Sequence, residues 1–243
     1  QCMVAGTNDW RQNHAAYNRG EMDKWAMANT PYSIGYVHEA DIPVQYKLAE
    51  AFTVGDMYYE SIMSSTAPNR VSWFSGTINP PKGSKVNGTN KYMGGPTLDN
   101  RDSVGCERTD SGKPFSCVPL RWKTVPEYLQ EAGISWRVYQ DKDNFGDDPL
   151  VMWKQYQTSA KKKGDLAQRG TSFPGLQKFF DDARDGKLPE VSYIVAPMQL
   201  SEHPPYMPMD GAWIQGEVAK AVMHGKNWDS TALIYSYDET GGW

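Results

Sequence analysis

Two adjacent carboxylates, Asp238 and Glu239, follow an apolar run over residues 230–237. The β-branched and aromatic residues of that run predict a buried strand. In open α/β sheets, ligand sites lie just beyond the carboxyl ends of the strands. Two carboxylates there suit a hard divalent cation such as calcium, manganese or magnesium, which prefers oxygen ligands. A solvated acidic turn explains the same pair equally well, so both alternatives stay open at this point.

A second chemical feature is the group of hydroxyls at Ser64, Ser65 and Thr66, which directly precedes the sequence APNR at 67–70. A hydroxyl at a helix N-terminus is well placed to attack phosphorus, because the backbone N–H groups there stabilise an oxyanion. The alternative is ordinary helix capping, for which serine and threonine are common residues.

The third feature is His203, which lies in the sequence SEHPP at 201–205. The two prolines restrict the backbone and hold the imidazole in one place. A histidine held in this way can donate a proton to a leaving oxygen or stabilise phosphoryl charge, although a structural loop histidine remains the alternative. Together, the three features fit metal-assisted phosphoryl transfer.

Composition limits the class of protein. A chain of 243 residues with 12% aromatic residues can bury a full core. A net charge of −4 argues against a nucleic-acid partner, and no apolar run is long enough for a transmembrane segment. No Gly-rich nucleotide loop is present, so ATP is not the expected phosphoryl donor. Cys106 and Cys117 are the natural disulfide pair in an oxidising compartment, with two free thiols as the alternative.

The spacing of apolar residues predicts alternating helices and strands around these features. Helices are expected at 41–52, 125–132, 172–183 and 212–223, strands at 134–139, 191–196 and 230–237, and a long loop at 78–113. Such alternation predicts an α/β fold with a mostly parallel sheet covered on both faces.

The ordered motifs of the chain resemble those of the bacterial and fungal phospholipase C and acid phosphatase family. The matching segments are 18–25 (NRGEMDKW), 34–36 (IGY), 41–43 (DIP), 65–70 (STAPNR), 75–77 (SGT), 136–145 (WRVYQDKDNF), 201–205 (SEHPP) and 237–239 (YDE). The segment 136–145 is closer to the phospholipase C branch. The resemblance implies an alkaline-phosphatase-like three-layer sandwich with a mostly parallel central sheet, incomplete in this chain.

The resemblance also implies residue roles. Thr66 matches the hydroxyl nucleophile, which forms a phosphothreonyl intermediate and contacts the metal, ahead of Ser64 and Ser65. Asp238 and Glu239 match the acidic pair that binds a divalent metal ion, and His203 matches a histidine at the phosphate. The expected substrate-binding residues are Asn69, Arg70, Glu202, Asn8 and His14, where Asn8 stands at a position that is often histidine in the family and His14 is a nearby substitute.

The expected activity is hydrolysis of a phosphoric ester, with phospholipase C cleavage of a glycerophospholipid in first place. An acid phosphatase of the same family and an inactive fragment that acts as a binding module are the alternatives. Aromatic residues near the expected site, such as Trp73 or Trp136, are candidates to contact a choline cation, with core packing as the simpler explanation. The resemblance further implies secretion or a cell-envelope location and transient contact with a membrane surface.

Two departures from the family pattern concern the ends of the chain. Family members carry a Glu-Asn segment upstream that completes the metal site, and a Phe-Asp-His segment beyond the acidic pair. Residues 1–243 are therefore expected to be one catalytic domain that lacks both segments.

Overall fold

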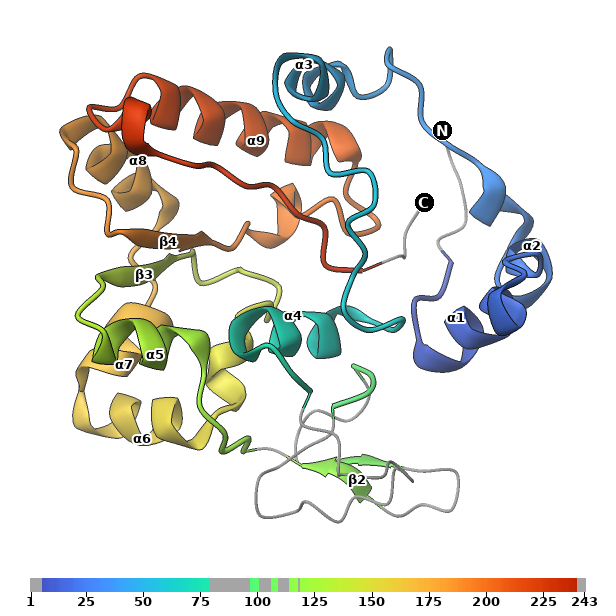
Figure 1. Cartoon of the computed structure of the whole chain (residues 1–243), viewed down its shortest axis with the longest axis horizontal. Coiled ribbons are helices and arrows are strands. Elements are labelled where there is room, and N and C mark those ends of the chain that lie inside the picture. Colours follow the sequence, from blue (N-terminus) through green and yellow to red (C-terminus); the bar gives the residue numbers. More distant parts are fainter. Residues whose placement is uncertain (1–5, 79–96, 101–105, 109–113, 118, 240–243) are drawn as a thin grey trace.

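The computed structural model describes residues 6–78, 97–100, 106–108, 114–117 and 119–239 (Figure 1), and the ranges 106–108 and 114–117 are described for the backbone alone. In chain order the elements are α1 (Trp10–Tyr17), η1 (Asn18–Gly20), α2 (Trp25–Ala28), η2 (Pro31–Ile34), α3 (Pro43–Ala51), α4 (Thr66–Ser75), β1 (Cys106–Arg108), β2 (Pro114–Cys117), α5 (Val125–Glu131), β3 (Trp136–Tyr139), η3 (Pro149–Met152), α6 (Lys154–Lys162), α7 (Asp165–Gly170), α8 (Leu176–Asp185), β4 (Val191–Ile194), η4 (Met198–Leu200), α9 (Pro208–Met223) and η5 (Trp228–Ser230). Short helices therefore make up most of the regular structure in the described ranges.

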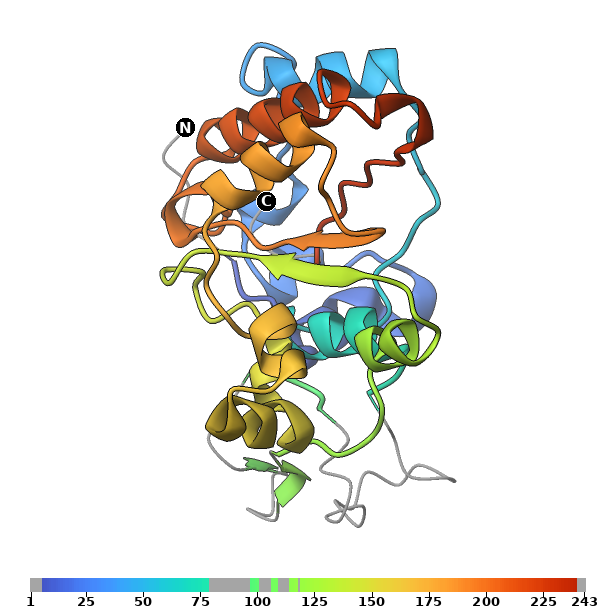
Figure 2. The ribbon, with the colours of Figure 1, turned by 90° about the vertical axis from the view of Figure 1, so that its left-hand side faces the viewer.

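A parallel pair of strands, β3 and β4, lies at the centre of the described chain. Trp136 pairs with Val191 at one end of the ladder and Tyr139 with Ile194 at the other. Helices lie on both faces of this pair, with α8 and α9 on one side and α4 to α7 on the other (Figures 1 and 2). The prediction of an α/β fold with a parallel sheet between helical layers is confirmed at this level.

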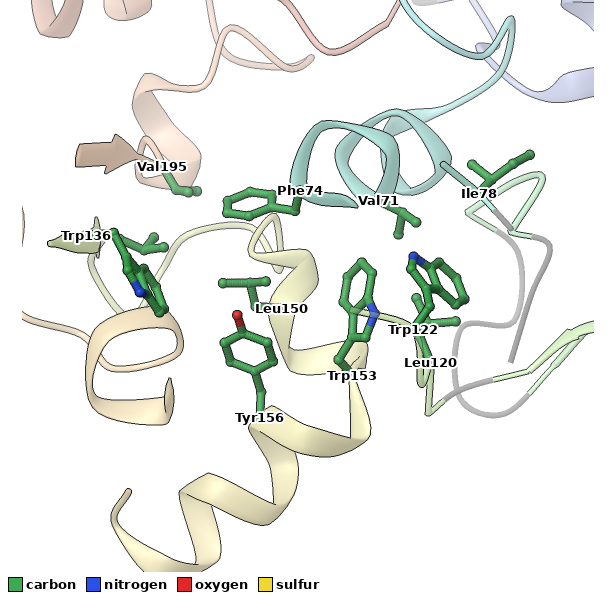
Figure 3. Close-up of a cluster of buried hydrophobic side chains, with 11 residues drawn as sticks. Val71, Phe74, Ile78, Leu120, Trp122, Trp136, Leu150, Trp153, Tyr156 and Val195 are labelled. Atoms are coloured by element: carbon green, nitrogen blue, oxygen red, sulfur yellow. The ribbon is translucent and has the colours of Figure 1, made fainter. Parts of the chain in front are cut away.

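Each face of the β3–β4 pair has its own hydrophobic core because side chains alternate along a strand. The larger core (Figure 3) is formed by Val71, Phe74, Ile78, Leu120, Trp122, Trp136, Val138, Leu150, Trp153, Tyr156 and Val195. The second core is formed by Tyr139, Leu176, Phe179, Ile214, Val218 and Val222. Trp136 is fully enclosed in the larger core, so core packing rather than choline contact explains it, whereas Trp73 is partly exposed.

Helices with strong local signals form where the sequence predicts them. Thr124 and Glu127 form the predicted capping box of α5, in which the Thr124 backbone N–H donates to Glu127 Oε2 at 2.8 Å. Helix α9 begins four residues before its predicted start. Pro208 occupies its first turn, and the Asp210 carboxylate accepts a hydrogen bond from the Met207 N–H at 3.2 Å.

The predicted strand over 230–237 is wrong for the described chain. Its first residue belongs to η5, and the segment after it is extended but pairs with no strand in the described ranges. Side chains tie it to α9 instead. The Tyr235 hydroxyl donates to the Gln215 carbonyl at 2.7 Å, and Leu233 packs against the second core. An apolar alternating run becomes a strand only where a neighbouring backbone offers the ladder hydrogen bonds.

The predicted loop over 78–113 is also only partly correct, because it contains β1, which pairs antiparallel with β2. Residues 79–96, 101–105 and 109–113 lie outside the described residues. The register of β1 and β2 places the Cys106 backbone directly opposite that of Cys117. Their side chains lie outside the description, so the disulfide stays a prediction.

Candidate active site

Helix α4 carries the predicted nucleophile at its first position. Thr66 follows the N-cap residue Ser65 and is half-buried. The Ser64 hydroxyl donates to the Leu98 carbonyl at 2.5 Å, and the Ser65 hydroxyl donates to Asp99 Oδ1 at 2.8 Å. The hydroxyl of Thr66 makes no hydrogen bond with any described residue. Of the three neighbouring hydroxyls, the one of Thr66 is therefore the one available for chemistry.

Asn69 holds the loop that leads into this helix. Its Oδ1 accepts a hydrogen bond from the Ile62 N–H at 2.9 Å, and its Nδ2 donates to the carbonyls of Ile62 at 2.8 Å and Ser65 at 3.2 Å. The side chain is 5% exposed. The structure therefore gives Asn69 a positioning role for the nucleophile segment, and the predicted contact with substrate stays untested.

Arg70 connects the nucleophile helix to the acidic pair at the far end of the chain. It lies four residues after Thr66 in α4, so the two side chains share a helix face. Its Nε lies 3.1 Å from Asp238 Oδ2, and its Nη2 lies 3.1 Å from Asp147 Oδ2. The guanidinium thus connects Asp238 to the face of α4 that carries Thr66.

Asp147 is a site residue that sequence reasoning missed. Arg70 Nη1 also donates to its backbone carbonyl at 3.1 Å. Burial raises the pKa of Asp147, the charge of Arg70 lowers it, Asp238 raises it and His203 lowers it. The charges of Arg70, Asp238 and His203 therefore all act on the Asp147 carboxyl. The signal was available, since Asp147 belongs to an acidic pair that follows a predicted strand, just as Asp238 does.

His203 lies in the loop after η4, half-buried, with its ring 4.5 Å from that of Phe145. Its Nδ1 is 2.7 Å from the carbonyl oxygen of Pro204. A carbonyl only accepts hydrogen bonds, so Nδ1 carries a proton and Nε2 is the atom that can exchange one. The charge of His203 also lowers the pKa of Asp147, so the two side chains interact electrostatically.

Glu202 acts as a brace between distant segments. Its carboxylate accepts hydrogen bonds from Gln215 Nε2 at 2.7 Å, the Tyr237 hydroxyl at 3.1 Å and Gln45 Nε2 at 3.4 Å. Burial raises its pKa, which these hydrogen bonds partly counter. Because Glu202 precedes His203 and is bonded to the residue before Asp238, it holds both site segments together. A contact with substrate remains a prediction.

The N-terminal candidates Asn8 and His14 lie in and just before α1. His14 is exposed, and its ring stacks on Trp10 with centroids 3.8 Å apart. Asp99 links this helix to α4, because it accepts hydrogen bonds from the Trp10 N–H at 3.3 Å and from the Ser65 hydroxyl. Asn8 and His14 make no described contact with Arg70 or with the two acids that it bonds, so their predicted role in substrate binding is untested.

Comparison with known proteins identifies the relatives of this chain. The model of the Phosphoesterase family matches residues 2–243. The chain belongs to the phosphoesterase family. It is 40% identical over 244 residues to the non-hemolytic phospholipase C of Pseudomonas aeruginosa, across 98% of this chain and 32% of that protein. It is 33% identical over 258 residues to phospholipase C A of Mycobacterium tuberculosis, across 100% of this chain and 45% of that protein. The resemblance drawn from the motifs is confirmed, and the chain spans less than half the length of these curated relatives.

The described part of the chain does not form a complete cation site. It contains no group of three or more His, Cys, Asp or Glu side chains arranged to hold a metal ion. Asp238 is engaged by Arg70, and a hard cation such as Mg²⁺ or Ca²⁺ needs six or more oxygen ligands. Metal binding by Asp238, Glu239 and Thr66 therefore stays a prediction that requires further ligands.

Gly211 in α9 tests the Glu202 brace. A Cβ at this glycine would overlap side-chain atoms of Glu202. We expect Gly211→Ala to displace that carboxylate and to lower the free energy of unfolding of this phosphoesterase by about 1–3 kcal/mol. The matched control is Gly216→Ala in the same helix, where the nearest atom is 3.7 Å away and alanine favours the helix. Equal stability of the two variants in urea unfolding would contradict the brace.

Asp148, next to Asp147, gives the site a pH dependence. It is 2% exposed, and burial raises its pKa to about 6, although hydrogen bonds from Gln140 and Leu150 oppose the shift. Because the folded pKa lies above the unfolded value of 3.8, the ionised form destabilises the fold as pH rises from about 4 to 6. Between pH 4 and pH 7, we expect the free energy of unfolding of Asp148→Asn to rise relative to that of wild type by on the order of 3 kcal/mol. Urea unfolding at the two pH values measures this change. A difference that is constant with pH would show that the pKa of Asp148 is the same in the folded and the unfolded protein.

Proposed function

We propose that this chain carries the catalytic core of a phospholipase C, which cleaves a glycerophospholipid to diacylglycerol and a phospho-headgroup. The observation that carries the proposal is the hydroxyl of Thr66, which bonds to no described residue and lies one helical turn from Arg70. Arg70 Nε in turn lies 3.1 Å from Asp238 Oδ2. The relatives named phospholipase C support the same substrate class.

In the proposed reaction, Thr66 Oγ1 forms a bond to phosphorus and the bond from phosphorus to the glycerol oxygen breaks. The threonine proton passes to water, and Nε2 of His203 gives a proton to the leaving alcohol. Water then attacks this phosphorus, which still carries the headgroup; the bond from phosphorus to Thr66 Oγ1 breaks, the hydroxyl of the water stays on phosphorus, and its proton goes to Thr66 Oγ1. His203 regains its proton from solvent, so the site returns to its starting state.

Arg70 has two tasks in this proposal. It bonds both Asp147 and Asp238 and so offsets the repulsion between them, and it places positive charge on the helix face that carries Thr66. A phosphate at the start of α4 would be favoured by that charge and by the first backbone N–H groups of the helix. A divalent cation at Asp238 and Glu239 remains part of the proposal, with ligands beyond those described.

Three further parts of the proposal are supported less directly. An alkaline-phosphatase-like sandwich is supported by the helical layers on both faces of β3 and β4. Contact with a membrane surface is supported by the exposed apolar side chains of Met57, Tyr58 and Tyr59. No helix in the described ranges is long and apolar enough to cross a bilayer. Secretion or an envelope location is proposed on the family resemblance.

The rate of hydrolysis of two chromogenic substrates by the full-length protein tests the function. We expect kcat/KM for p-nitrophenylphosphorylcholine, a diester, to exceed that for p-nitrophenyl phosphate, a monoester. A preference for the monoester would favour the acid phosphatase alternative. If neither is hydrolysed while phosphatidylcholine vesicles still bind, the chain is a binding module.

A further inference from the structure

A cationic pocket lies apart from the candidate active site. It has a volume of about 320 Å³ and is lined by β3, α8, the end of α7 and the segment before β4. Ser135 and Pro189, which precede β3 and β4, form part of its wall. Asp147 and His203 instead follow the carboxyl ends of these parallel strands. The pocket therefore shares no lining residue with the candidate active site.

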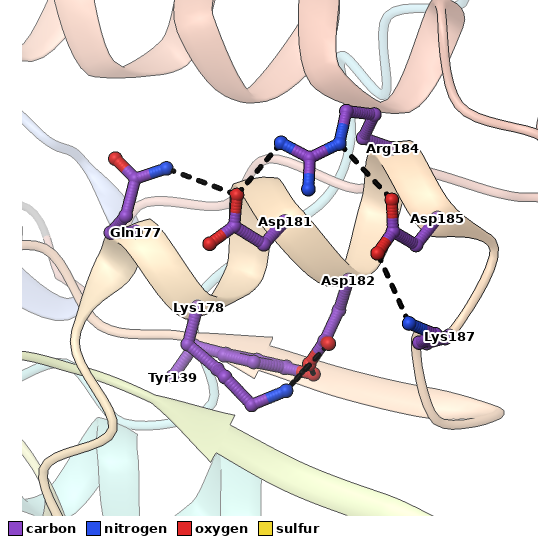
Figure 4. A network of polar contacts seen from close by, with 8 residues as sticks. All are labelled: Tyr139, Gln177, Lys178, Asp181, Asp182, Arg184, Asp185 and Lys187. Atoms are coloured by element: carbon purple, nitrogen blue, oxygen red, sulfur yellow. Dashed lines mark hydrogen bonds and ion pairs between the residues drawn. The ribbon is translucent and has the colours of Figure 1, made fainter.

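Four basic side chains line this pocket, namely Arg137, Arg169, Lys178 and Lys187, against one carboxylate, Asp182. Both lysines are already bonded to acids (Figure 4). Lys178 Nζ is 2.5 Å from Asp182 Oδ1, and Lys187 Nζ is 3.1 Å from Asp185 Oδ2. The negative charges next to the pocket are thus engaged by the lysines.

The role of the two arginines in this pocket is not explained by the contacts of the fold. Arg137 and Arg169 are half-buried, and neither guanidinium makes a hydrogen bond or ion pair with any described residue. Arg137 shares a face of β3 with Tyr139, which points toward α8. The Arg137 charge also acts on Asp182, since it helps the bonds from Lys178 and Tyr139 to lower a pKa that burial would raise.

Tyr139 connects β3 to α8 at this pocket. The Tyr139 hydroxyl donates to Asp182 Oδ2 at 2.8 Å, and its ring packs edge-on against Phe179 at 5.5 Å. This arrangement fixes α8 against β3 and keeps Asp182 turned toward Lys178 and Tyr139. Asp182 already accepts hydrogen bonds from Lys178 and Tyr139. It therefore does not serve as an acceptor for the guanidinium groups of Arg137 and Arg169.

A half-buried guanidinium has lost part of its hydration and needs acceptors for its N–H donors. Its planar fork matches the oxygen atoms of a phosphate, often through two parallel hydrogen bonds. We propose that this pocket binds the phosphate group of an anionic ligand, with Arg137 and Arg169 as its principal donors. The ligand is either soluble phosphate or the headgroup of an anionic phospholipid, which present the same chemistry.

Titration calorimetry of the full-length protein with inorganic phosphate tests the site. We expect the double variant Arg137→Gln/Arg169→Gln to lose one phosphate site or to weaken it about 10-fold or more. The matched control is Arg121→Gln, which removes an exposed arginine outside the pocket and should bind as wild type does. Circular dichroism melting checks that all variants fold. Unchanged phosphate binding in the double variant would overturn the proposal.

Phosphate can also bind at the candidate active site, so a second variant separates the two. Arg70→Met should leave the site at Arg137 and Arg169 intact, and loss of all phosphate binding in Arg70→Met would overturn the proposal. Vesicles of phosphatidylcholine with and without phosphatidic acid identify the source. Arginine-dependent binding to the phosphatidic acid vesicles supports a lipid headgroup. Equal binding to both vesicles, with the calorimetric site retained, supports soluble phosphate.

Discussion

Thr66→Ala should lower kcat/KM of the full-length protein for p-nitrophenylphosphorylcholine by about 10³-fold or more, because loss of a nucleophile has effects of this size. The fold should change little. The Thr66 hydroxyl bonds to no described residue. Replacing a side chain without such bonds typically changes the free energy of unfolding by no more than about 0.5 kcal/mol. This variant should therefore lose its activity while its stability stays close to that of wild type. Residual activity near wild type would exclude Thr66 as the nucleophile.

Two neighbouring variants sharpen this test. Thr66→Ser keeps a hydroxyl at the first position of α4 and should retain measurable turnover. Ser65→Ala removes the adjacent hydroxyl, which donates to Asp99, and should cost about 1 kcal/mol of stability with a smaller loss of activity. Acid quenching during turnover, followed by mass spectrometry, should find phosphorylcholine on Thr66. Phosphorylcholine on Ser65 would reassign the nucleophile to that residue.

Arg70→Met should destabilise the protein and lower its activity together. Methionine keeps the length of the side chain but leaves Asp147 and Asp238 without the cation that both contact at 3.1 Å. Because burial already raises the pKa of Asp147 and Arg70 opposes that rise, the variant should raise this pKa further. Because these ion pairs are partly buried, we expect the free energy of unfolding to fall by about 1–3 kcal/mol at pH 7.5.

The pH dependence of that loss distinguishes it from a simple packing defect. A raised folded pKa penalises the ionised carboxylate, so the penalty should shrink as pH falls and Asp147 takes up a proton. Urea unfolding at pH 5 and pH 7.5 measures this difference. The control is Arg184→Met, which removes an arginine bonded to Asp181 and Asp185 at the surface of α8 and should change stability little. The same loss at both pH values would contradict the charge argument.

Local sequence patterns predicted the parts of the structure that neighbouring residues specify. The capping box of Thr124 and Glu127 starts α5, and the hydroxyl cluster at 64–66 leads into α4, because helix starts depend on a few adjacent side chains. The helix signals and the residues of β3 and β4 were likewise readable from apolar spacing. The ordered motifs also identified the family, which the comparisons confirm.

Contacts between distant residues required the folded chain. Arg70 meets Asp147 across 77 residues and Asp238 across 168 residues, and no local pattern specifies such pairs. The same limit explains the missed role of Asp147 and the wrong strand over 230–237, since a strand depends on a partner that its own residues do not encode. Residue types thus predicted a hydroxyl, a histidine and acids for phosphoryl chemistry. Long-range packing of α4 against two loop segments joined the hydroxyl helix to the acids through Arg70, because only the fold brings those backbones together.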